Sequence, residues 1–168
     1  MSAYFGKYRG KVLENIDPLQ KGRILAQVAD VLNMLPSTWV MPCVPFAGIQ
    51  SGLFVVPAVG SGVWIEFEQG DPDFPIWTGG FWGSADEVPP LALATTPGLQ
   101  AIVIQTTSQN MLMISDMPGP SGGILLKTAT GAMISINDTG ITITNGQGAT
   151  LMMTGPSVNV NEGALEVV

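Results

Sequence analysis

The chain has 168 residues, of which 46% are hydrophobic and 11% are charged, so it can form one domain, or a small domain with an appendage, and is not intrinsically disordered. Six basic residues against 13 acidic ones give a net charge of −7, which excludes the basic footprint that nucleic-acid binding needs. One cysteine and no histidine exclude an intrachain disulfide, a zinc site and a histidine-based catalytic triad.

The sequence carries no sign of membrane insertion or export. It has no run of 18 apolar residues, and its start, "MSAYFGKYRG", lacks an apolar signal core. We therefore expect the protein to be made in the cytoplasm and kept there until a larger particle carries it. The 21 Gly and 13 Pro residues, and a single short candidate helix at residues 29–34, predict an all-β fold with many turns.

Residues 1–83 have the pattern of a compact β-barrel. The clearest strand is "GVWIEFEQGD", in which three apolar residues that face a core alternate with Trp64, Glu66 and Glu68. Pro42 and Pro45 break another strand, which favours an edge or a bulge. The strands are predicted at "YRGKVLEN" (8–15), "RILAQVADVL" (23–32), "WVMPCVPFAG" (39–48), "GVWIEFEQGD" (62–71) and "PIWTGGFWG" (75–83), with a turn at "IDPLQKG".

Residues 84–98, "SADEVPPLALATTPG", are predicted to be a Pro-rich connector with an extended path. From residue 99 to residue 168 the pattern becomes a ladder, in which an inward apolar residue returns every seven or ten positions. Turn signals such as "DMPGPSGG", "NDTG" and "NGQG" separate the rungs. The rungs are Ile104, Ile114, Ile124, Ile134, Ile141, Leu151, Val158 and Leu165.

The ladder predicts a homotrimer. Its strands are only about four residues long, below the usual length, and there is no capping helix. A lone solenoid or sandwich of this size buries too little apolar surface to offset its ordering cost of ~1–2 kcal/mol per residue, whereas three copies wound around one axis close the interior. The predicted trimer core consists of Ile114, Ile124, Ile134, Ile136, Ile141, Ile143, Leu151, Met153, Val158 and Val160.

These motifs resemble the phage baseplate assembly protein V and VgrG-like spike family over nearly the whole chain. In the barrel they are "GKV" (10–12), "DP" (17–18), "GR" (22–23), Trp39, Pro42 and "PAVGSGVWIEFEQGDPDFPIWTGG" (57–80). In the ladder they are "KTATGAMISINDTGITI" (127–143) and "NGQGATLMMTGPSVNVNEGALEVV" (145–168). The resemblance implies an all-β fold: an N-terminal OB-fold barrel followed by a C-terminal intertwined trimeric β-helix.

The resemblance also implies a function. Members of this family are homotrimeric spikes at the centre of a contractile-tail baseplate, in a virion or a related tail particle. They sit under a hub protein, carry a separate tip protein with a PAAR-type fold and contact the target cell envelope transiently as they breach it. The family's lysozyme insertion is absent here, because the connector is too short, and so is the His-x-His pair that binds iron in relatives with their own pointed tip.

Two contact sites are expected on this trimer. Three copies of the chain end would form an apolar platform with unpaired backbone groups, so we expect a tip protein to dock there. The tip-docking residues are Gly163, Ala164, Leu165, Val167 and Val168. Trp77, Phe81 and Trp82 crowd a Gly-rich segment and could anchor the hub protein, or could simply plug the barrel.

Other chemistry has only weak signals. Glu66 and Glu68 share a strand face at roughly 7 Å, a carboxylate spacing known in glycosidases, but a solvated barrel face explains them better. Asp71 and Asp73 are expected to form a turn rather than a cation site, and Cys43 to be a small buried apolar side chain. We predict no enzyme activity and no cofactor.

Two other classes of protein remain open. One is a free-standing β-barrel module that binds carbohydrate or protein through a stacking platform of Trp64, Trp77, Phe81 and Trp82. The other is an OB-fold that binds nucleic acid, which the net charge argues against. The molecular mass in solution discriminates the spike, which is a trimer, from a binding module, which can be a monomer.

Overall fold

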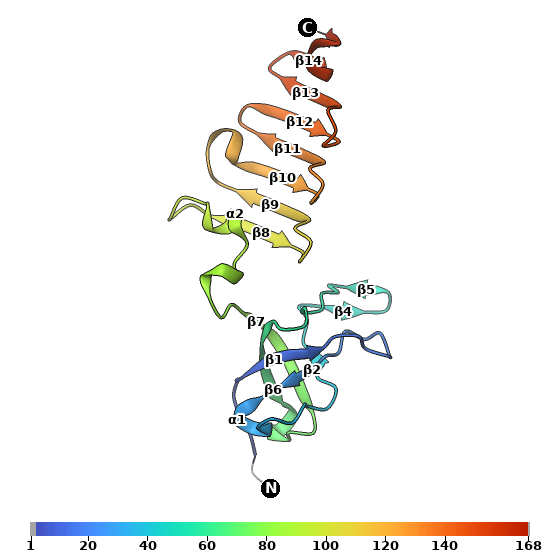
Figure 1. The fold of residues 1–168 in the computed structure, drawn as a ribbon, viewed down its shortest axis with the longest axis vertical. Coiled ribbons are helices and arrows are strands. Elements are labelled where there is room, and N and C mark those ends of the chain that lie inside the picture. The colour runs from blue at the N-terminus through green and yellow to red at the C-terminus, as the bar shows by residue number, and fades with distance from the viewer. Residues whose placement is uncertain (1–2, 168) are drawn as a thin grey trace. The chain divides into compact units, whose positions relative to one another are not determined.

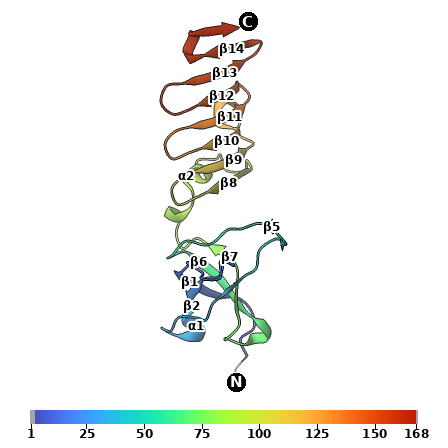
Figure 2. The same cartoon turned by 90° about the vertical axis from the view of Figure 1, so that its right-hand side faces the viewer.

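The computed structural model describes residues 3–167, and the chain divides into two compact units, Met1–Glu87 and Val88–Val168. Both units are built from β-strands, with helices of only three or four residues between them (Figure 1, and turned by 90° in Figure 2). The prediction of an all-β chain with a barrel before a ladder of short strands is confirmed.

The first unit is a curled sheet with strand order β2-β1-β6-β7-β3. All neighbours in it are antiparallel except β3 and β7, and a bridge between Ile24 and Val40 joins the two edges. Because Pro42 lies in edge strand β3, its missing N–H costs no ladder bond, as the sequence indicated. The strands are β1 (Tyr8–Glu14), β2 (Leu25–Gln27), β3 (Met41–Pro42), β6 (Gly62–Phe67) and β7 (Pro75–Phe81).

Alternation along β6 builds the core of this unit. Val63, Ile65 and Phe67 are buried, whereas the residues between them are partly exposed, so the predicted inward set is confirmed. The core is closed by side chains from the other strands and from the segments that flank them. The buried apolar cluster comprises Val12, Ile24, Ala26, Val28, Val40, Val63, Ile65, Phe67 and Trp77.

Two local expectations for the first unit need correction. The strand expected over residues 23–32 ends at Gln27 and gives way to the short helix α1 (Ala29–Leu32). Cys43 is exposed rather than buried, because it follows an edge strand that has a neighbour on one side only. Beyond Cys43 the chain leaves the barrel sheet and forms a separate two-stranded hairpin, β4 (Ala47–Gly48) and β5 (Ser51–Gly52).

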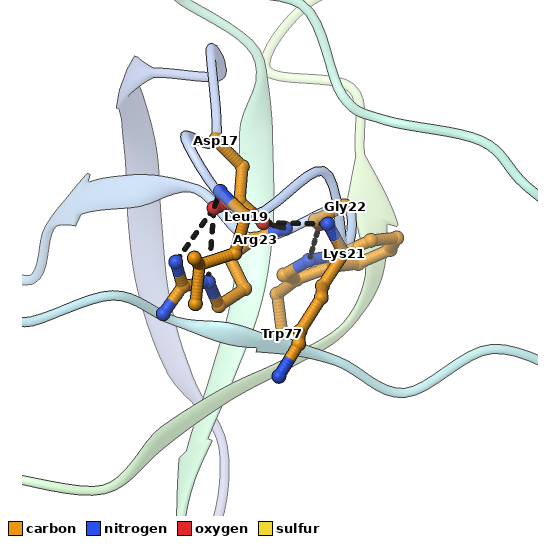
Figure 3. A network of polar contacts seen from close by, with 6 residues as sticks. All are labelled: Asp17, Leu19, Lys21, Gly22, Arg23 and Trp77. Atoms are coloured by element: carbon orange, nitrogen blue, oxygen red, sulfur yellow. Dashed lines mark hydrogen bonds and ion pairs between the residues drawn. The ribbon is translucent and has the colours of Figure 1, made fainter.

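A buried carboxylate holds the loop between β1 and β2 (Figure 3). One oxygen of Asp17, Oδ1, accepts hydrogen bonds from Arg23 Nη2 at 2.6 Å, from Arg23 Nε at 3.1 Å and from the backbone N–H of Leu19 at 2.9 Å. The other, Oδ2, accepts from the N–H of Lys21 at 2.8 Å and of Arg23 at 3.3 Å. The Arg23 guanidinium and these N–H groups hold the pKa of Asp17 well below its usual range.

The same loop is tied to the core by an aromatic side chain. Trp77 donates its indole N–H to the carbonyl oxygen of Gly22 at 3.2 Å, next to the Asp17 network (Figure 3). Arg23 also lies 5.1 Å from the centre of the Trp39 ring. The "DP" motif therefore supplies the carboxylate of one ion pair, and the "GR" motif supplies its guanidinium.

The second unit is an eight-stranded antiparallel sheet in which each strand pairs with its neighbours in sequence. Figure 1 shows the strands stacked one on the next from β8 to β14. Gly123 and Gly140 begin two strands where a side chain would collide with the carbonyl oxygens of Ile136 and Met153. The strands are β8 (Ala101–Gln105), β9 (Met111–Ser115), β10 (Gly123–Lys127), β11 (Met133–Asn137), β12 (Gly140–Thr144), β13 (Thr150–Thr154), β14 (Ser157–Val160) and β15 (Leu165–Val167).

Strand pairing in this unit lies within one chain. Short turns bring consecutive strands together and satisfy their backbone hydrogen bonds locally, so the sheet is not intertwined strand by strand with another chain. Three such units can therefore meet as whole sheets, through their side chains. Five short helices complete the chain: η1 (Glu68–Gly70), η2 (Ala85–Glu87), α2 (Pro90–Leu93), η3 (Gly119–Ser121) and η4 (Asn161–Gly163).

The connector is not extended, which corrects the expectation for residues 84–98. It contains η2 and α2, and Pro90 stands in the first turn of α2, where proline costs no helical hydrogen bond. Helix α2 packs against β8 within the second unit.

The Asp17 network predicts how the first unit responds to acid. A carboxylate whose pKa is depressed by folding stabilises the fold above its ordinary pKa of about 3.9, and this contribution is lost as the pH falls from about 5 toward 2. We expect Asp17→Asn to lower the denaturant midpoint clearly at pH 7 and to flatten its dependence on pH. Trp fluorescence during urea unfolding measures both, because Trp77 lies beside the network.

The matched control is Asp30→Asn, which removes an exposed carboxylate from α1. It should leave the midpoint at pH 7 unchanged. Equal midpoints for Asp17→Asn and the unsubstituted protein would mean that the network does not stabilise the fold.

Candidate functional site

Register places the apolar residues of the second unit in two continuous rows on one face of the sheet. Ile114 stands opposite Ile124, and Ile124 opposite Ile136, and the same relation continues from strand to strand. The first row is Ile102, Ile114, Ile124, Ile136, Ile141, Met153 and Val158. The second row is Ile104, Leu112, Leu126, Ile134, Ile143, Leu151, Val160 and Leu165. We call these two rows the apolar face.

The apolar face is not covered by the described part of the chain. Nine of its large side chains are 38–62% exposed, from Ile143 at 38% to Ile104 at 62%. Full burial of such a side chain stabilises by about 1.5–3 kcal/mol, so burying the part that is still exposed would add about 1 kcal/mol for each residue. For nine residues the free energy available from burying this face is roughly 10 kcal/mol per chain. No residue of the two rows is charged, which makes the face suited to a dry interface.

The opposite face of the sheet is different. Near the start of the sheet it carries Val103, Met113 and Leu125, and Met113 is buried. Farther along, the same column continues with Ser135, Thr142, Met152 and Asn159, so it is polar at most strands. Only one side of the sheet is therefore apolar over its whole length.

All ten residues predicted for the trimer core lie on the apolar face, in the two rows given above. The sequence also named Ile104 and Leu165 as rungs, but it missed Ile102, Leu112 and Leu126. The signal was present, because each of these lies two residues from a residue already counted in the same strand. By the same rule Met111, Met113, Met133 and Met152 lie on the other face, and Met153 lies on the apolar face.

The last strand, β15, is an open edge of the sheet. It pairs with β14 on one side, and Val160 stands opposite Leu165. Gly163, in η4, donates its N–H to Asn159 Oδ1 at 2.9 Å, and Leu165 is 58% exposed. Ala164 is exposed too, Val167 stands opposite Val158 in the backbone register, and Val168 lies outside the described residues.

The three aromatic residues expected to contact a hub have different surroundings. Trp77 is 7% exposed and belongs to the core, so its indole is not available on the surface of the unit. Phe81 is half-buried against Trp64, with ring centres 4.9 Å apart, and Arg9 lies 5.1 Å from its ring. Of the three, only Trp82 is free, at 63% exposed.

A larger exposed apolar surface was missed on the hairpin of β4 and β5. Phe46, Ile49 and Phe54 are exposed there, and Ile49 is 98% exposed. The sequence carried a signal, since residues 31–65 contain no charged side chain at all. Exposed apolar side chains gathered on a projecting hairpin are typical of a protein-binding surface.

The carboxylates weighed for catalysis have structural partners. Glu66 accepts from Lys7 Nζ at 2.6 Å, in an exposed ion pair, and Glu68 begins η1 beyond the end of β6. Asp71 accepts from the N–H of Asp73 at 3.0 Å, as a turn former does. Within residues 3–167, no cluster of three or more metal-ligating side chains occurs. None of the helices described reaches the length and apolar character needed to span a membrane.

The fold and the apolar face together define a class of protein. It has an OB-type half-barrel followed by an antiparallel sheet whose inner strands are paired on both sides but whose apolar face is not covered within the described chain. Comparison with known families agrees. Residues 8–82 match the family described as the type VI secretion system and phage-baseplate injector OB domain. Residues 101–166 match the phage baseplate V C-terminal trimerisation domain. The comparison with curated proteins gave no match.

The chain belongs to the phage baseplate V family, with the OB injector domain first and the trimerisation domain second. It is therefore a structural, non-enzymatic spike protein of the baseplate. The apolar face lies in the segment that matches the trimerisation domain, which supports a homotrimer.

The apolar face predicts opposite outcomes for two neighbouring residues of β12. In Ile143→Asp, one carboxylate per chain would be brought close to two others in a desolvated interior, at a cost of several kcal/mol each, so we expect the trimer to be lost. Thr142→Asp places the same charge on the opposite face and should leave the trimer intact. Multi-angle light scattering gives the mass of each variant. A full-size Ile143→Asp trimer with unchanged melting would show that this face is not the interface.

Proposed function

We propose that three copies of this chain form the central spike of a contractile-tail baseplate, held under a hub protein and capped by a separate tip protein with a PAAR-type fold. The spike would pass force from the contracting tail to the tip and help to breach the target cell envelope. The observation that carries this proposal is the apolar face, which is uncharged over eight strands and has no cover in the described chain. It is supported by the match of that segment to a trimerisation domain.

A rigid shaft requires that its strands do not separate under load. Every strand from β9 to β14 has hydrogen-bonded neighbours on both sides, so axial force is spread over many backbone bonds. Burial of three apolar faces around one axis would add roughly 30 kcal/mol before the costs of association, from about 10 kcal/mol per chain. Such an assembly resists dissociation because no single contact can be released alone.

The tip protein is proposed to dock on β15 and the turn before it. An edge strand presents unpaired N–H and C=O groups, to which another chain can add a strand. Asn161 and Glu162 have positive φ angles of 49° and 54°, so the turn before β15 is sharply folded. Contact at Leu165 would be apolar, and only Glu162 and Glu166 bring charge to this end of the chain.

The hub is proposed to bind the OB unit at Trp82. A large aromatic side chain that is more than half exposed is a typical interface anchor, whereas Trp77 already serves the core. The exposed hairpin of β4 and β5 is the second surface that a hub could use. Both surfaces are apolar, so we expect hub binding to depend little on salt.

A free-standing carbohydrate-binding barrel fits the structure less well. The stacking platform considered for it needed Trp64, Trp77, Phe81 and Trp82 in one layer. Trp77 is buried, and Trp64 and Phe81 pack on each other with ring planes 48° apart. No flat surface of four rings remains for a sugar.

Deleting residues 163–168 tests the tip contact. The deletion removes β15 and leaves most of the apolar face, so we expect the trimer to assemble but to lose its tip protein. Co-purification with the tagged tip protein, together with the mass by light scattering, measures both. In the full-length chain, Leu165→Asp should also abolish the contact, whereas Glu162→Gln should keep it. A truncated trimer that still binds the tip protein would place the contact elsewhere.

Alanine at Trp82 tests the hub contact. Removing a central aromatic anchor typically costs about 2 kcal/mol or more, which corresponds to roughly 30-fold weaker binding. The trimer itself should be unchanged in mass and melting. The control is Phe5→Ala, which removes another exposed aromatic from the same unit. Binding that survives Trp82→Ala but is lost in Ile49→Ser would move the hub contact to the hairpin.

A further inference from the structure

Charge is scarce in the second unit. Among residues 88–168 there are one basic and four acidic side chains. Glu162 and Glu166 stand at the end of the sheet, which leaves three charges along its length: Asp116, Lys127 and Asp138. All three are exposed.

The lysine stands at one edge of the sheet and the two aspartates stand at the other. Lys127 ends β10 and pairs in register with Met111 and Met133, so it marks one edge. Asp116 follows the last residue of β9, and Asp138 follows the last residue of β11, both at the other edge. Since β10 lies between β9 and β11, the lysine is level with the gap between the two aspartates.

The lysine cannot reach either aspartate in its own chain. Five residues of β10 separate the two edges, which is roughly 15 Å of extended chain. Among the described residues, the only ion pairs are Lys7 with Glu66 and Arg23 with Asp17. Asp138 accepts a hydrogen bond from the N–H of Gly119 at 2.9 Å, which fixes its carboxylate at the edge.

A cyclic trimer brings opposite edges together. Three identical sheets that surround one axis, with their apolar faces inward, must each place one edge against the other edge of the next sheet, because a rotational three-fold interface is heterologous. If the three-fold axis runs parallel to the two apolar rows, and so across the strands, each strand lies about 4.8 Å farther along the axis than the one before it. The end of β10 in one chain then lies within about one strand spacing of both aspartates in the next.

We propose that Lys127 of each chain pairs with Asp116 and Asp138 of the neighbouring chain, at all three corners of the trimer, and that these contacts favour the symmetric trimer, with its three sheets at equal height, over staggered arrangements. The proposal rests on the trimer proposed above and adds the polar contacts that align its neighbouring edges. The apolar rows cannot supply this alignment, because they repeat isoleucine and leucine at nearly every strand. A lone cation between two anions matches at one height only.

Zero-length carbodiimide coupling of the purified full-length protein tests the contact directly. The reagent joins a lysine amine to a carboxylate only where the two already touch. We expect a covalent trimer on a denaturing gel, and peptide mass spectrometry should find Lys127 joined to Asp116 or Asp138. A bond within one chain is excluded by the width of the sheet, so each such product reports a contact between chains.

The matched control is Lys127→Arg, which keeps the charge but cannot be coupled by this reagent. Its trimer should have the same mass by light scattering and should lose the Lys127 products. Coupling yield at these positions should fall with added salt, because exposed charges are screened. A trimer in which Lys127 couples to neither aspartate overturns this inference alone, whereas a monomer in light scattering overturns the proposed spike as well.

Charge exchange gives a second measurement. Lys127→Glu places three like charges at each corner and should speed dissociation of the trimer by about tenfold or more. Adding Asp116→Lys restores an opposite pair and should recover most of the loss. Asp116 is chosen because, among the described residues, the Asp138 carboxylate accepts a hydrogen bond from Gly119 and the Asp116 carboxylate accepts none. Additive effects of the two substitutions, with no recovery, would contradict the pairing.

Discussion

The apolar face of the second unit is the constraint on which the rest of this protein depends. Short turns pair each strand with the next, so the strands from β9 to β14 are paired on both sides within one chain. The side chains of the sheet are not all packed, because one face is apolar over eight strands and stays about half exposed. The need for partners therefore comes from the uncovered apolar face rather than from unpaired strands inside the sheet.

The first unit has the opposite balance. Its core of nine buried side chains is closed by its own strands, and a buried ion pair between Asp17 and Arg23 fixes the loop that covers Trp77. It needs no partner to complete its packing. The apolar side chains that remain exposed on it, such as Trp82 and Ile49, do not belong to this core, which is why they are the proposed contacts for a hub protein.

The two units also differ in how they obtain specificity. A barrel core is specific because each side chain fits one site. Two rows of similar aliphatic residues are adhesive but weakly specific, since sheets shifted along the axis would bury nearly the same surface. The few polar side chains then decide how the sheets align. In the proposed trimer the charges of Asp116, Lys127 and Asp138 therefore matter more than exposed charges usually do.

Alternation within each strand was enough to predict much of the fold and of the apolar face. It identified β6 and its inward residues, and it put the ten residues expected in the trimer core on one face of the sheet, because the side-chain period of a strand is a local property. Pairing and burial are not local, and only the tertiary structure decided them. It placed Trp77 in the core and Cys43 at the surface, and it paired each strand of the second unit with its neighbours in the same chain. These outcomes depend on which distant segments cover a residue, and that information is spread over the whole chain.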